Sequence, residues 1–123
     1  MLLLYVAGIA VRSRFGIRVV INNFSGETLR NVVVKVEERG NRYGLADLEP
    51  GGRKRTWVQP VTECHIKLEF VDAKNKPHGE TIVGYAEGGY CGSATVNILP
   101  GNRVESSVHL KPFCDLHSWL GFM

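Results

Sequence analysis

The sequence contains no apolar run long enough to cross a membrane as it stands. Its longest run, MLLLYVAGIAV, spans residues 1–11, whereas a membrane-spanning helix needs about 20 residues. No charged n-region precedes this run and no clear A-x-A cleavage site follows it. Two interpretations of residues 1–15 stay open. They are either the end of a signal anchor that starts upstream of Met1, which we favour, or an apolar strand or short helix that covers the domain.

Acidic residues are absent from the first 18 positions, where the basic residues are Arg12, Arg14 and Arg18. The whole chain has 15 basic and 12 acidic residues, so the remaining 105 residues carry 12 of each. The pI of 8.9 therefore reflects a basic N-terminal flank and not a basic domain. The RKR stretch at 53–55 is interpreted as a solvated strand edge, and we expect no nucleic-acid partner. The positive-inside tendency of the three arginines opposes export, unless charges upstream outweigh them.

Helical periodicity is also missing, because no long segment places apolar residues at i, i+3, i+4 and i+7. Alternation of period two runs through the chain instead and predicts one buried and one wet face for each strand. Three further runs, at 42–48, 53–59 and 80–87, are less regular. The clean alternation predicts these inward-facing sets: Ile17, Val19 and Ile21; Val32, Val34 and Val36; Cys64, Ile66, Leu68 and Phe70; Ala94, Val96 and Ile98; Val104, Ser106, Val108 and Leu110.

Turn residues separate these runs, and all five prolines fall at the ends of expected strands. The sequence therefore predicts an all-β fold, an antiparallel β-sandwich of Ig-like or transthyretin-like type with about 7–8 strands. We expect the sandwich to occupy residues 16–112. It follows the apolar N-terminal segment 1–15, and a C-terminal tail, 113–123, packs on the domain.

Four landmarks occur in order along the chain: INNFSGETLRNVVVKV, LADLEPGG, KLEFVDAKNK and GGYCGSATVNI. Over residues 17–99 they resemble a loose group of small, uncharacterised bacterial proteins. Those proteins carry one N-terminal membrane anchor and a single extracytoplasmic β-sandwich. The resemblance implies a location and a fold, and it implies no chemistry. The apolar start of this chain is shorter than the anchor of that group.

Motifs for nucleotide binding, such as G-x-G-x-x-G or the P-loop, are absent, and so are CxxC and HxH metal motifs. We therefore expect no catalytic residue, no cofactor and no metal site. Cys91, within GGYCGS, is interpreted as a small residue at a strand entrance, with Gly88 and Gly89 in a turn and Gly92 at a bulge. The alternative for Cys91 is a disulfide, since any two of Cys64, Cys91 and Cys114 could pair and leave one over.

The function expected from these features is a non-catalytic interaction module that recognises a protein partner, with no small-molecule substrate. We expect it to be anchored through residues 1–11 and to face the periplasm or the cell exterior. The loops NNFSGE (22–27) and DAKNKPHG (72–79) are the expected contact regions. Four aromatic side chains are candidate anchors for the partner, although we expect at least two of them to pack in the core. They are Tyr43, Trp57, Tyr85 and Tyr90.

Two alternatives from other classes stay open. One is a small periplasmic protein that handles metal through Cys and His side chains, for which Cys114, His117 and His109 are the candidate ligands. The other is a cytoplasmic subunit of a larger complex that buries residues 1–15 against its partner. Neither the strand order nor the oligomeric state follows from the sequence.

Overall fold

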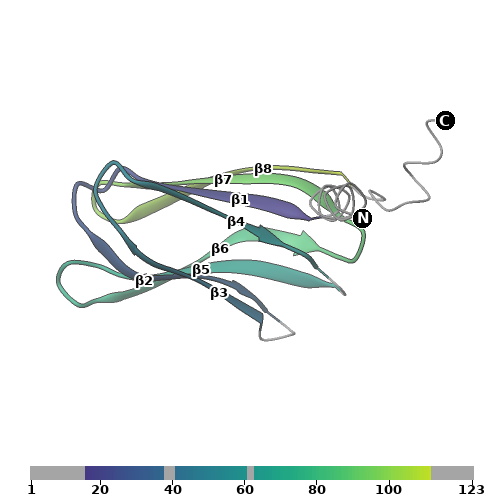
Figure 1. Ribbon diagram of the computed structural model, residues 1–123, viewed down its shortest axis with the longest axis horizontal. Coiled ribbons are helices and arrows are strands. Elements are labelled where there is room, and N and C mark those ends of the chain that lie inside the picture. The colour runs from purple at the N-terminus through teal and green to yellow at the C-terminus, as the bar shows by residue number, and fades with distance from the viewer. Residues whose placement is uncertain (1–15, 38–40, 61–62, 112–123) are drawn as a thin grey trace, which may run out of the picture.

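The protein folds into two stacked β-sheets of four strands each (Figure 1). The computed structural model describes residues 16–37, 41–60 and 63–111, and every regular element in these ranges is a strand. The expectation of an all-β sandwich is confirmed. The strands are β1 (Ile17–Asn23), β2 (Leu29–Val36), β3 (Asn41–Leu48), β4 (Arg53–Val58), β5 (Cys64–Val71), β6 (Pro77–Ala86), β7 (Cys91–Leu99) and β8 (Arg103–Lys111).

The two sheets have the strand orders β4-β1-β7-β8, here called sheet A, and β3-β2-β5-β6, here called sheet B. All neighbouring strands run antiparallel except β1 and β7, which are parallel. In an Ig constant-type domain the first, second, fifth and fourth strands share one sheet. Here the first and second strands lie in different sheets, so the observed order differs from the Ig order.

The core lies between the sheets and consists of the side chains that the alternation placed inward. Ile17, Val19 and Ile21 of β1 are completely buried, and β2, β5 and β7 contribute matching rows. Phe70 is the largest side chain among those that are almost fully buried. Because successive strand residues point to opposite faces, a single alternating run is enough to commit one side of each strand to this core.

Strand β8 departs from the expected pattern. Val104 and Leu110 pack against the core, but Ser106 is exposed and Val108 is 38% exposed. The expectation of a fully inward row is therefore wrong for the middle of this strand. β8 is an edge strand of sheet A, so its core-facing side chains have a neighbouring strand on one side only.

All described residues fall within the expected domain, 16–112. The expected N-terminal segment, 1–15, and the C-terminal tail, 113–123, lie outside the described residues. Within the ranges that the structure describes, no helix is long and apolar enough to span a membrane.

Candidate binding site at one end of the sandwich

Three loops meet at the same end of the sandwich (Figure 1). They are the β1–β2 loop, the β5–β6 turn and the β7–β8 turn, and they surround a cleft of about 370 Å³. The first two are the loops expected to carry partner contacts, so the structure brings together two segments that lie about 50 residues apart in the sequence. The cleft is lined by Ser25, Glu27, Asp72, Lys74, Lys76, His78, Gly101 and Asn102.

The β1–β2 loop is held by Asn23, whose side chain is completely buried. Its Nδ2 donates to the carbonyl oxygens of Glu27 and Leu48 at 2.8 and 2.9 Å. Its Oδ1 accepts hydrogen bonds from the backbone N–H and the hydroxyl of Ser25, at 3.0 and 2.6 Å. A buried amide that uses all of its hydrogen-bonding capacity in this way fixes the loop, because releasing it would leave buried polar groups unpaired.

The β5–β6 turn is held in the same manner by Asp72, which is 5% exposed. Its Oδ1 accepts from the backbone N–H groups of Lys74 and Lys76, both at 2.9 Å. Its Oδ2 lies 2.8 Å from Nε2 of His78 and 3.4 Å from Nδ2 of Asn102. The pKa of Asp72 is lowered, first by the hydrogen bond from His78 and then by the backbone N–H of Lys76.

His78 joins this polar cluster to the core. Its ring stacks on Phe70 with the centroids 4.9 Å apart, while Nε2 contacts the Asp72 carboxylate. The ring is thereby fixed in position. Since Ser25 bonds to Asn23, and His78 to Asp72, these polar side chains serve to hold the loops.

The cleft has a mixed charge. Two ammonium groups, those of Lys74 and Lys76, stand with the carboxylates of Glu27 and Asp72 on its lining. Lys74 and Lys76 are exposed, whereas Asp72 is buried and already bonded to four groups. The arrangement therefore offers exposed cationic contacts on a rigid rim, which suits recognition of a polar surface.

The four candidate aromatic anchors divide evenly. Tyr43 and Tyr90 pack against the core, whereas Trp57 is 44% and Tyr85 49% exposed. The expectation that at least two of them would pack in the core is confirmed. Tyr85 donates to Glu87 at 2.7 Å, and this hydrogen bond is the main reason that its pKa is raised.

Sequence reasoning missed two features of the cleft end. Phe24, in the β1–β2 loop, is 52% exposed, and an apolar residue inside the turn sequence NNFSGE was the signal for it. The β7–β8 turn contributes Gly101 and Asn102, which the sequence marked only as turn residues.

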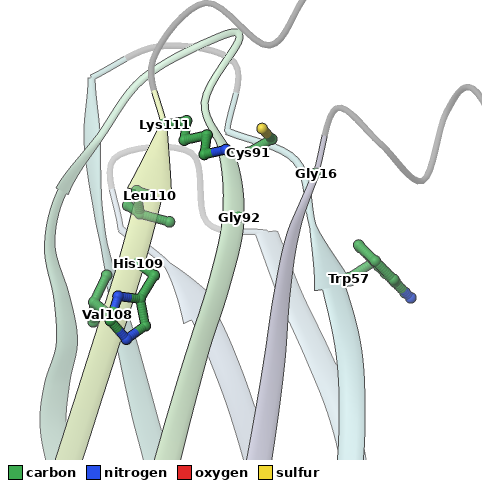
Figure 2. Close-up of a pocket in the computed structure, with 8 residues that line it drawn as sticks. All are labelled: Gly16, Trp57, Cys91, Gly92, Val108, His109, Leu110 and Lys111. Atoms are coloured by element: carbon green, nitrogen blue, oxygen red, sulfur yellow. The ribbon is translucent and has the colours of Figure 1, made fainter.

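Cys91 is disulfide-bonded, and Cys64 is a buried thiol at the start of β5. The disulfide alternative therefore holds for Cys91. Cys114, the remaining cysteine, lies outside the described residues. Cys91 borders a second cavity, of about 720 Å³, near the opposite end of sheet A (Figure 2). Its described lining comprises Gly16, Trp57, Cys91, Gly92, Val108, His109, Leu110 and Lys111.

The glycines around Cys91 act differently from expectation. Gly89 has a φ of +87°, as a turn glycine should, but Gly88 has no positive φ. The expected bulge at Gly92 is wrong, because the β7–β8 register runs without a shift from Cys91 to Leu99. Gly92 is instead needed because a Cβ there would lie 2.1 Å from the carbonyl oxygen of His109.

The candidate metal ligands are not assembled by the described part of the chain. His109 is exposed on β8, and Cys114 and His117 lie outside the described residues. Among the described residues, no group of three or more His, Cys, Asp or Glu side chains is placed to hold a metal ion.

Comparison with known proteins identifies a fold and no family. No family model matches the chain, and no curated protein matches it. Among solved structures, the chain is similar to the NMR structure of a protein from Eubacterium rectale, with a TM-score of 0.53 and 7% sequence identity. The match covers 76% of this chain and 88% of that one. At this identity the likeness concerns the fold alone.

Proposed function

We propose that the protein is a non-catalytic recognition module that contacts a protein partner through the loop-end cleft. The observation that carries the proposal is the convergence of loops 22–27 and 72–79 on one cleft. Each loop is fixed from within by a buried polar side chain, Asn23 in the first and Asp72 in the second. A pre-ordered rim loses little conformational freedom on binding, which favours recognition.

The proposed location is the outer side of a bacterial membrane, with attachment through residues 1–11. The disulfide at Cys91 supports export, because disulfides persist in oxidising compartments and are rare in the cytosol. For the architecture we propose the transthyretin-like alternative. The placement of the first and second strands in different sheets supports it over the Ig-like one.

Site-specific photo-crosslinking tests the proposed function. A photoreactive amino acid replaces Lys74 on the cleft, and in a second variant it replaces Glu63, which is exposed near the start of β5 at the other end. In the native host we expect one discrete adduct from position 74 and none from position 63. Adding Lys76→Glu to the position 74 probe should remove the adduct, because it reverses one charge on the rim.

Adducts of the same size and yield from both positions would contradict a specific contact at the cleft. So would an adduct from position 74 that persists when Lys76 is replaced. Far-UV circular dichroism and a melting curve for each variant establish that the comparison is made between folded proteins.

A further inference from the structure

The outer face of sheet A carries a patch of basic side chains contributed by three of its four strands, β1, β4 and β8. The register aligns Trp57 of β4, Arg18 of β1, Ser93 of β7 and His109 of β8 in one row across the sheet. Since side chains two residues apart on a strand share a face, the other outward positions follow from this row. The charged members of this basic face are Arg18, Arg53, Arg55, Arg103, Lys111 and Glu105.

Five of these six side chains are basic and one is acidic, and all six are exposed. Arg53 donates to Asn22 through Nε at 2.8 Å, and within the described residues neither Arg18 nor Arg55 forms an ion pair. Uncompensated charges of one sign on one face create a local potential that attracts the opposite charge.

Sheet B provides the contrast. On its outer face Lys35 pairs with Glu37 at 3.9 Å, and Arg42 pairs with Glu69 at 3.6 Å. Two of the four Lys and Arg side chains in the strands of sheet B, those of Lys35 and Arg42, thus have an acidic partner. The whole chain has a net charge of only +3, so the excess on sheet A is a segregation of charge produced by folding.

Trp57 adds an amphipathic aromatic ring to the basic face. It is 44% exposed and projects away from β4 (Figure 2). Tryptophan is enriched at the headgroup level of membranes, where its apolar ring and its N–H group are both satisfied. The apolar segment of residues 1–11 also leads into β1, a central strand of this sheet.

We infer that the basic face of sheet A lies against anionic phospholipid headgroups. The inference rests on the membrane attachment proposed above, and adds the surface that would face the lipid. Arginine forks bind phosphate oxygens in a bidentate manner, and several of them on one flat face match a surface of closely spaced phosphates. Single-stranded nucleic-acid sites usually stack bases on several aromatic rings, whereas Trp57 is the only Phe, Tyr or Trp side chain on this face within the described residues.

Vesicle partitioning of the full chain tests this inference. Binding is measured by co-sedimentation with vesicles of pure phosphatidylcholine and with vesicles that contain about one third phosphatidylglycerol. Binding to the neutral vesicles measures the contribution of the apolar segment. The ratio of the partition coefficient on anionic vesicles to that on neutral vesicles, here called the anionic increase, measures the contribution of charge. Each arginine near an anionic surface raises the partition coefficient about fivefold. Because the two contributions multiply, the double variant Arg18→Gln/Arg55→Gln should lower the anionic increase about 25-fold.

The matched control is Arg42→Gln/Lys67→Gln, which removes the same charge from the outer face of sheet B. We expect it to leave the anionic increase within about twofold of the wild type. Raising the salt from 0.1 M to about 0.5 M should abolish the increase in the wild type, since exposed charges are then screened.

Equal losses from the two double variants would overturn the inference, because net charge and not this face would then explain binding. An unchanged increase in Arg18→Gln/Arg55→Gln would overturn it as well. So would tighter binding of a DNA oligonucleotide at the same salt, if the same two arginines were required. Loss of binding to neutral vesicles counts against the proposed anchor instead, and a missing crosslink at position 74 counts against the cleft.

Discussion

Replacing Gly92 with alanine should be among the most damaging single-methyl changes in this domain. Gly92 has a φ of +132°, a region that side chains other than glycine rarely adopt. A Cβ at this position would lie 2.1 Å from the carbonyl oxygen of His109 and 3.0 Å from the Cα of Leu110, and both are backbone atoms of β8. Neither contact can be relieved by rotating a side chain, so β8 must move away from β7.

The magnitude follows from two contributions. Backbone strain at a positive φ costs about 1–3 kcal/mol, and each ladder hydrogen bond lost as β8 shifts costs about 0.5–1.5 kcal/mol. With two such bonds lost next to Gly92, we expect Gly92→Ala to lower the free energy of unfolding by about 2–6 kcal/mol. Domains of this kind have a total of about 5–15 kcal/mol, so the loss is a large share of it.

Two glycines serve as controls in the same urea-unfolding assay, monitored by far-UV circular dichroism. Gly89 has a φ of +87° but open space around its Cβ position, so Gly89→Ala should cost only the conformational penalty of about 1–2 kcal/mol. Gly84 has no positive φ and no atom close to its Cβ position, so Gly84→Ala should be neutral or stabilising by up to about 1 kcal/mol. If Gly92→Ala unfolds at the same urea concentration as Gly89→Ala, the close approach of β8 is not what requires glycine.

Two other predictions concern ionisation and thiols. Because the folded pKa of Asp72 is lowered from its ordinary value of 3.8, its contribution to stability is present above about pH 4 and is lost as the pH falls through the folded pKa. Unfolding measured from pH 6 to pH 2 should therefore show a smaller loss at low pH in Asp72→Asn than in the wild type, and parallel curves would refute this. Alkylation without reductant should modify Cys64 only after unfolding and leave Cys91 unmodified, as read by peptide mass; labelled Cys91 would contradict the disulfide.

Much of the local structure was predictable from the sequence, because period-two alternation acts strand by strand. The eight expected runs correspond to β1 to β8, and the inward residues of β1, β2, β5 and β7 are buried as expected. The interpretation of residues 53–55 as part of a solvated strand edge also holds, since β4 is an edge strand and Arg53 and Arg55 are exposed.

The exposed middle of β8 could not be predicted in this way. Its alternation of Val104, Ser106, Val108 and Leu110 is as regular as that of a buried strand. Burial, however, depends on what covers a strand from the opposite sheet and from both sides. An alternating pattern carries no information on whether a strand lies at the centre or at the edge of its sheet.

The sequence by itself therefore determined which segments become strands, which face of each strand is apolar and where the chain turns. These properties depend on neighbouring residues, through backbone conformation and side-chain alternation. Only the tertiary structure decided that β1 lies between β4 and β7, that loops 22–27 and 72–79 share one cleft, and that the arginines of three strands gather on one face. Those juxtapositions join residues that are tens of positions apart, and they are set by the packing of both sheets around a common core.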